Sequence, residues 1–281
     1  MKLVIDESLG IMFRNRLATL GFLIVAIVCI SAVLAPWLVS HDAFEMNLAA
    51  RLSAPSSGHL LGTDSFGRDI LTRILLGANI AMRVALAAVS VAFAIGVPLG
   101  AISGYKGGLL DTVVMRLTDS LLAFPGRLLA IVLVAALGTS FFTLCIAIGV
   151  NAIPGYIRVV RAAVLVQKEK EYVEAARMAG ELEGHILFLQ ILPNCLAPIL
   201  VLLTLDFAHA ILLESSLSFL GLGFAPPAPS WGLMLSEARG FMEIAPHAAI
   251  FPGLAISATI LGFNLLGDGL RDIFDPRQYE S

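Results

Sequence analysis

The chain has 281 residues, of which 58% are hydrophobic and 14% charged, and its formal net charge at pH 7 is −3. Because an ordinary soluble domain has about 25% charged residues, a water-soluble fold cannot hide this much apolar surface, whereas a bilayer accepts it directly. The slight negative charge argues against a nucleic-acid partner. Cys29, Cys145 and Cys195 show no CxxC or Cys/His ligand spacing, which argues against a disulfide framework or a zinc site.

Long apolar runs predict an all-α, polytopic membrane protein with about six transmembrane helices. We interpret the first run, 17–39, as a retained span, because no convincing cleavage pattern of a signal peptide follows it. Further spans are expected at about 80–103, 114–137, 141–163, 196–220 and 246–267. This divides the chain into 1–79, holding the N-terminal tail, first span and an outer loop, and 80–281, a core of five spans with a cytoplasmic loop at about 164–195.

The distribution of Lys and Arg predicts how the chain is oriented in the membrane. With the N-terminus in the cytoplasm, the inner segments hold twelve basic residues and the outer segments hold four, namely Arg51, Arg68, Arg73 and Arg239. Arg83 and Arg127 are ambiguous. Both termini are therefore expected on the cytoplasmic side.

The two long outer segments contain turn signals and amphipathic stretches. In the first, Gly-Thr-Asp and Gly-Arg-Asp predict turns, and the apolar residues from Ile70 to Leu75 have a helical spacing that suits a helix along the membrane surface. In the second, at about 221–245, Trp231 is expected as an anchor at the membrane interface. His41 and His59 lie in the first segment, and we expect no metal site there.

The cytoplasmic segment predicts two short helices joined by a bend. Tyr172, Ala175, Ala176 and Ala179 share one face of a helix over 171–179, and Gly180 suits the left-handed conformation that ends a helix. A second helix is expected from 181–183 to Pro193. The pair forms a rigid peg suited to docking on a separate protein, although a plain amphipathic connector fits the residues equally well.

Several motifs resemble one family. Glu174-Ala175-Ala176, Gly180 and Leu192-Pro193 match the EAA signature of ABC-importer permeases. Almost the whole chain is similar to the second-permease (C-type) subunit of the dipeptide, oligopeptide and nickel group, through HLLGTDSFGRDILTRILLGA, LTDSLLAFPG, KEYVEAAR, SLSFLGLG, PPAPSWG and FNLLGDGLRDIFDPR. The chain departs from the pattern at Gln190, where the broad signature prefers an apolar residue, and at 181–184, where relatives commonly carry small residues.

The resemblance implies a type I ABC importer permease fold (MetI-like) in a bacterial inner membrane. It implies a second homologous permease, two ABC ATPases docked on the EAA loop and an external solute-binding protein as partners, besides membrane lipid. ATP and Mg²⁺ would belong to the ATPases. The chain itself has no GxxxxGK[ST] phosphate loop, so we expect neither a bound cofactor nor enzymatic activity.

Ionisable residues at membrane depth are candidates for a substrate pathway. In the fifth span Asp206 and His209 are spaced i, i+3 and share a face with each other. In the third span Arg127 stands where relatives usually have an apolar residue. Two interpretations are open for these residues: they line a substrate pathway, or they form buried pairs that fix the rotation of the helices. Arg127 has a third, in which its side chain extends to the membrane interface. The complete set is Asp119, Arg127, Asp206, His209 and Glu214.

The motifs favour short peptides as the substrate. Nickel or a metal chelate, glutathione and opine-like solutes are the alternatives within the same family, and Asp206 with His209 would suit a cation. A secondary transporter is less favoured, because it needs an ion relay and usually an inverted repeat. A non-transporting scaffold leaves the intramembrane charges unexplained.

Overall fold

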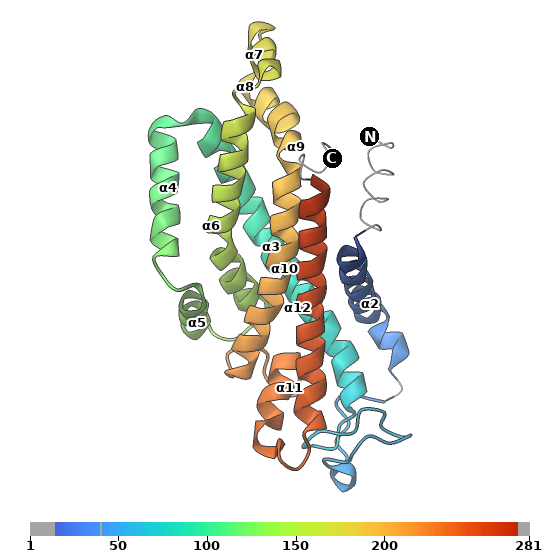
Figure 1. Ribbon diagram of the computed structural model, residues 1–281. Helices are drawn as coiled ribbons and strands as arrows, with labels where there is room; N and C mark the ends of the chain where they lie inside the picture. Colours follow the sequence, from blue (N-terminus) through green and yellow to red (C-terminus); the bar gives the residue numbers. More distant parts are fainter. Residues whose placement is uncertain (1–14, 40, 275–281) are drawn as a thin grey trace.

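The computed structural model describes residues 15–39 and 41–274, and these residues are almost entirely helical. Within these two ranges the one strand-like pairing is an isolated bridge between Thr63 and Asp69. In chain order the elements are α2 (Arg16–Leu38), η1 (Leu48–Ala50), α3 (Ile70–Lys106), α4 (Gly108–Leu122), α5 (Gly126–Leu137), α6 (Phe141–Gln167), α7 (Glu171–Met178), α8 (Glu183–His185), η2 (Ile186–Ile191), α9 (Leu192–Asn194), α10 (Leu196–Phe219), α11 (Trp231–Ala238), η3 (Arg239–Phe241) and α12 (His247–Phe274) (Figure 1).

The described residues contain five helices suited to span a membrane, and a sixth span if the bent pair α4–α5 counts as one. The five are α2, α3, α6, α10 and α12, which are long and apolar enough by length and composition, and α4 and α5 pass the same test only when taken together. The start of α2 and the end of α12 lie at the same end of the bundle as α7 (Figure 1), and there Asn15 donates to Asp272 at 3.0 Å. The all-α fold with about six spans is therefore confirmed.

The second span is longer than the sequence indicated. Helix α3 begins directly after Asp69, whose side chain accepts the Thr72 N–H at 2.8 Å as an N-cap. Ile70 is completely buried, so the stretch expected along the membrane surface is instead the first two turns of α3, and that expectation is wrong. The expected division at 79/80 falls inside this continuous helix.

The third span is broken in the middle. Helices α4 and α5 meet at an angle of 85° across the short break at 123–125. Pro125 at this point has no N–H to donate to the preceding turn, and it disfavours a helical conformation at Phe124. The proline thus produces a corner between two short helices, and α5 turns away from the direction of α4 (Figure 1).

Close contact between α3 and α6 forms the centre of the bundle. Glycines at every fourth position of α3, namely Gly96, Gly100 and Gly104, face α6 and allow the two backbones to meet. A Cβ atom at Gly100 would stand 2.7 Å from the carbonyl oxygen of Ile157, and one at Gly104 would stand 2.9 Å from that of Arg161. Any larger residue at these positions would separate the helices.

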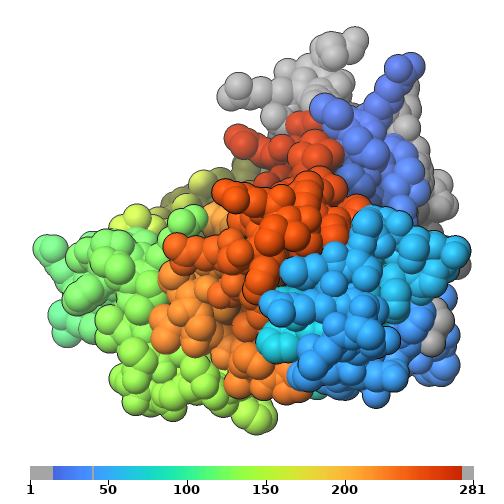
Figure 2. Space-filling model, turned by 90° about the horizontal axis from the view of Figure 1, so that it is seen from below, coloured from blue at the N-terminus to red at the C-terminus, as the bar shows by residue number. Residues whose placement is uncertain are grey.

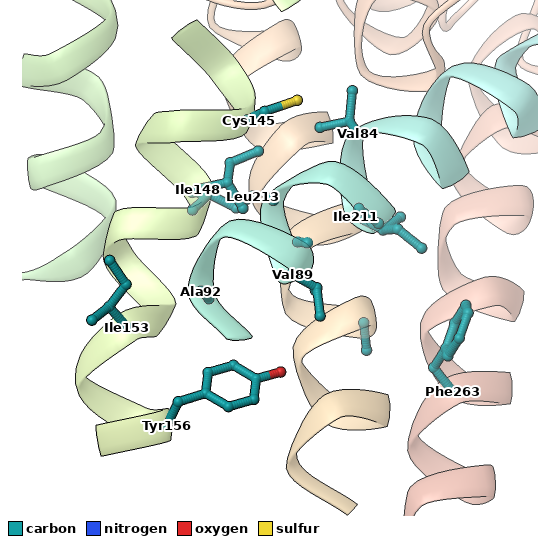
Figure 3. Close-up of a cluster of buried hydrophobic side chains, with 14 of the residues drawn as sticks. Val84, Val89, Ala92, Cys145, Ile148, Ile153, Tyr156, Ile211, Leu213 and Phe263 are labelled. Carbon is teal, nitrogen blue, oxygen red and sulfur yellow. The ribbon is translucent and has the colours of Figure 1, made fainter. Parts of the chain in front are cut away.

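Helix α10 packs against both members of this central pair. Figure 3 shows Val89, Ile148 and Leu213, which come from α3, α6 and α10, filling the space between the helices with apolar side chains. At the end of the bundle near α7, Arg161 of α6 donates two hydrogen bonds of 2.6 Å to Asp111 of α4. These contacts hold α6 in a fixed position between its neighbours.

The opposite end of the bundle is covered by the segment after α2 and by α11. Figure 2 shows these two parts of the chain side by side at this end. Trp231 begins α11 and is only 3% exposed, and its indole N–H donates to the carbonyl oxygen of Ile74 at 2.9 Å. Its expected role as an anchor at the membrane interface is therefore wrong, because the indole packs inside this cap.

Candidate functional site: a charged cavity and a helical peg

A cavity of about 270 Å³ lies between α3, α4, α5, α6 and α10. Most of its lining is apolar, with residues such as Val89, Ile148 and Leu213 on its walls. Four polar side chains also line it, namely Arg127, Asn151, Asp206 and His209. An apolar pocket with a few convergent polar groups is the usual form of a binding site for a small molecule.

The corner at Pro125 brings Arg127 to this cavity. Arg127 is the second residue of α5, and its exposed side chain makes no ion pair with any described residue. Asp206 and His209 reach the same cavity from α10, as their i, i+3 spacing predicted. The structure therefore joins a cation and an anion from different spans without pairing them to each other.

Asp206 is placed near the middle of α10, with its side chain half-buried. Its neighbour across the helix interface is Tyr156 of α6, whose side chain points toward α10 in Figure 3. Among the described residues no hydrogen bond of normal geometry reaches Asp206 Oδ2 or the Tyr156 hydroxyl. Asp206 lines the cavity, whereas Tyr156, which interacts with Asp206 across the helix interface, does not.

Two of the candidate residues lie outside the cavity. Asp119 pairs with Arg158 of α6, with 2.7 Å between Oδ1 and Nη2, and both side chains are about half exposed. Asp119 therefore meets neither Arg127 nor Asp206.

Glu214 is 1% exposed and accepts hydrogen bonds from Ser218 at 2.8 Å and from Ser230 at 2.9 Å. Because Ser230 directly precedes α11, Glu214 ties α11 to α10 and does not face the cavity.

The second candidate region is the peg formed by α7, α8, η2 and α9 (Figure 1). Gly180 has φ of +76°. Its N–H donates to the Arg177 carbonyl oxygen, and the N–H of Glu181 donates to the Ala176 carbonyl oxygen, which is the hydrogen-bond pattern of a Schellman motif. The predicted glycine bend is therefore confirmed. The second helix follows, with one π-helical segment, η2, before Leu192 and Pro193 lead into α10.

The inward and outward faces of α7 differ from the predicted pattern. Val173 and Ala176 are buried against η2, whereas Glu174 and Ala175 are exposed. Ala176 therefore packs inside the peg, whereas Ala175 lies on the exposed face of α7. This burial gives the peg a small core of its own, and the exposed residues of α7 are free to meet another surface.

The two departures from the family pattern contact each other. Gln190 donates to Oε2 of Glu181 at 2.5 Å, and His185 lies 2.8 Å from the same oxygen. Glu181 stands directly after the glycine bend, so these contacts connect the bend to η2. Gln190 and Glu181 therefore belong to one hydrogen-bond network, which stabilises the conformation of the peg.

Sequence reasoning missed an ionic cluster at the end of the bundle opposite the peg. Arg68 and Arg73 are buried there and share the carboxylates of Asp64 and Glu237. The Gly-Thr-Asp and Gly-Arg-Asp stretches carried a signal for it, since two of the four residues belong to these turns. The partner Glu237 lies in α11, and nothing in its local sequence marks it.

A bundle of apolar spans around a cavity with opposite charges, with a braced peg at one end, is typical of a membrane transport protein. Residues 96–279 match the family of binding-protein-dependent transport system inner membrane components, and residues 7–55 match the N-terminal transmembrane domain of oligopeptide transport permease C. The chain belongs to the family of binding-protein-dependent transport system inner membrane components, and it is a permease subunit of an ABC importer.

Curated relatives cover nearly the same length. The chain is 46% identical to the dipeptide transport system permease protein DppC of Alkalihalophilus pseudofirmus, over 94% of this chain and 87% of the relative. It is 44% identical to DppC of Haemophilus influenzae, over 94% and 92%, and 45% identical to the glutathione transport system permease protein GsiD of Pectobacterium atrosepticum, over 94% and 88%. A solved structure of the methionine ABC transporter MetNI in inward-facing conformations matches with a TM-score of 0.60 at 16% identity, over 73% of this chain and 98% of that chain. This likeness confirms the MetI-like fold.

Proposed function

We propose that this permease forms half of the translocation pathway for short peptides. The cavity between α5, α6 and α10 carries this proposal, because it presents a guanidinium and a carboxylate that are not paired with each other. A short peptide is a zwitterion with the complementary charges at its two ends. Arg127 would receive the C-terminal carboxylate, and Asp206, with His209 beside it, would receive the amino group.

The size of the cavity agrees with a shared pathway. A volume of about 270 Å³ lies just below the usual range of ligand pockets, which begins at about 300 Å³. A second homologous permease facing this one would complete the binding volume. The relatives named as dipeptide permeases support peptides as the cargo.

The peg would transmit the motion of two cytoplasmic ABC ATPases. Its residues Glu174, Ala175, Ala176, Gly180, Leu192 and Pro193 match the coupling signature. Met178 is 86% exposed and Leu182 is 81% exposed at the tip, and exposed apolar residues grouped in this way mark an interaction surface. Because the peg is braced internally and continues into α10, a displacement at its tip would reach the helix that carries Asp206.

The remaining assignments follow from this arrangement. The chain would lie in the bacterial inner membrane with both termini in the cytoplasm, since the start of α2, the end of α12 and the peg share one end of the bundle. An external solute-binding protein would deliver substrate at the end covered by α11. ATP and Mg²⁺ would bind to the ATPases, and this chain would hydrolyse nothing.

A second substrate class has specific support. Glutathione is itself a small peptide with several charges, and a glutathione permease is 45% identical to this chain. Asp206 and His209 in one cavity would also receive a cation such as nickel or a metal chelate. Asp206 and His209 therefore suit a metal cargo as well as a peptide. Opine-like solutes are zwitterions like peptides and would use the same charged groups.

The test is purification of the chain from its native membrane in a mild detergent, with identification of every protein that remains bound. The proposal predicts a second permease and two ATPases, and titration of the associated binding protein should then show binding of dipeptides or tripeptides in preference to nickel. A chain that is isolated alone, and that moves solute in liposomes without ATP, would contradict it.

A further inference from the structure

Three residues with metal-binding side chains meet at the outer end of the bundle. His41 follows α2, His59 lies 18 positions further along the loop, and Asp69 caps α3. One ligand atom from each of the three lies within 4.8 Å of the others. The imidazole rings of His41 and His59 have their centroids 5.0 Å apart. No local spacing in the sequence indicated this group, because the fold brings it together across the outer loop.

Two of the three ligands are already held in place. Asp69 is 5% exposed, and its Oδ2 accepts the Thr72 N–H at the start of α3, which leaves Oδ1 pointing at His59 Nδ1 at 3.0 Å. The backbone of His59 is fixed as well, since its N–H donates to Ser56 Oγ and its carbonyl oxygen accepts the N–H groups of Ser56 and Gly62. The carboxylate and the first imidazole are therefore preorganised.

We propose that His41, His59 and Asp69 bind a divalent transition-metal ion, with Zn²⁺ as the expected occupant. Two imidazoles and one carboxylate suit Zn²⁺, Ni²⁺ and Cu²⁺. At metal–ligand distances of about 2.0–2.2 Å, the ligand atoms must approach one another more closely than 4.8 Å. His41 is exposed and lies in a loop, so it is the ligand that moves, and water completes the coordination.

A bound metal ion would cross-link two segments of the outer face. The metal would fasten the loop after α2 to the N-terminus of α3, beside the cap that α11 forms. The site is separate from the cavity lined by Arg127 and Asp206, so its existence does not depend on which substrate the permease carries. A simple hydrogen bond between His59 and Asp69 would not require His41. The presence of His41 beside this pair is therefore the feature that favours a metal site over a hydrogen bond alone.

The test uses the full chain purified in detergent without a histidine tag, titrated with Zn²⁺ and separately with Ni²⁺ by calorimetry. One equivalent of metal is expected to bind outside the Asp206–His209 cavity, measured in a His209→Ala background, with its affinity reduced by about tenfold or more in His41→Ala and His59→Ala. Asp69→Asn keeps an oxygen for the Thr72 N–H, and it should also weaken binding. The matched control is His185→Ala, because His185 and Glu181 form a similar pair at 2.8 Å without a second histidine.

His41→Ala decides the matter, since an exposed loop residue can be removed without loss of the fold, which circular dichroism would confirm. Affinity for both metals that is unchanged in His41→Ala would overturn the proposal. Failure of the intact chain to bind either metal, or an equal loss in His185→Ala, would overturn it as well.

Discussion

Arg68, in the loop before α3, donates from Nη2 to Oε2 of Glu237 in α11 at a distance of 2.5 Å, although the two residues are 169 positions apart. The same guanidinium donates from Nε to Asp64 at 2.6 Å, and Arg68 is 1% exposed. The pair fastens α11 to the start of α3. It therefore fixes the cap at the end of the bundle opposite the peg.

Loss of the Glu237 carboxylate should destabilise this cap strongly. Glu237→Gln leaves Arg68 and Arg73 buried with the single carboxylate of Asp64, and removing one partner of a buried pair typically costs about 3–5 kcal/mol. Thermal unfolding in detergent, followed by circular dichroism, measures the effect. As a control, His185→Ala removes an exposed pair, which is worth less than about 1 kcal/mol. Equal melting temperatures for the two variants would show that the buried cluster contributes little.

A proline at position 180 should uncouple the permease from its ATPases. Gly180→Pro fixes φ near about −65°, whereas the bend has φ of +76°, and it removes the N–H that donates to the Arg177 carbonyl oxygen. The variant is expected to insert normally but to lose bound ATPase in a detergent pull-down. Gly184→Ala is the control, because Gly184 lies in α8 without positive φ and with no atom near an added Cβ. Full ATPase recovery with Gly180→Pro would refute the role of the peg.

Removal of the Arg127 charge should weaken transport of peptides with a free C-terminus. A hydrogen bond to a charged group contributes about 1.5–3 kcal/mol, so Arg127→Gln should raise the KM for a dipeptide by about tenfold or more. A dipeptide with an amidated C-terminus lacks the carboxylate and serves as the matched substrate. Uptake by the reconstituted importer should distinguish the two. An equal increase in KM for both substrates would show that Arg127 does not bind the C-terminal carboxylate.

The α3 glycines that face α6, Gly96, Gly100 and Gly104, should not tolerate an added methyl group. A Cβ at Gly100 would stand 2.7 Å from the Ile157 carbonyl oxygen, so Gly100→Ala should lower stability by about 1–3 kcal/mol through overpacking. Gly253→Ala in α12 is the control, since the one atom near its added Cβ is 3.9 Å away. That variant should be neutral or slightly stabilising because alanine favours helix. Unfolding midpoints of both variants provide the comparison, and a loss of stability in both would contradict close packing at Gly100.

Much of the fold was predictable because lipid imposes a simple requirement. A span needs about 20 apolar residues, so α2, α6, α10 and α12 were found close to their observed bounds. The start of α3 was placed too late, because Arg68, Asp69 and Arg73 make that stretch resemble a surface helix. Arg68 and Arg73 are buried with Asp64, which is close in sequence, and with Glu237, which lies far away in α11 and which no local pattern contains.

The candidate site was predictable in part for the same reason. The spacing of Asp206 and His209 along one helix placed them together, whereas the corner at Pro125 that turns Arg127 toward them became visible only in the structure. The partners of Asp119 and Glu214 were not predictable, since Arg158 and Ser230 belong to other elements. Helix periodicity shows which residues share a face, but it does not show which helix that face meets.

Peptide uptake by proteoliposomes tests the central claim most directly. The complex of this permease with its second permease and ATPases would be reconstituted, supplied with the binding protein and a radiolabelled dipeptide, and assayed with and without ATP inside the vesicles. The account predicts accumulation that requires ATP and that Gly180→Pro abolishes. Accumulation by this chain alone, driven by an ion gradient and unaffected by ATP, would contradict it.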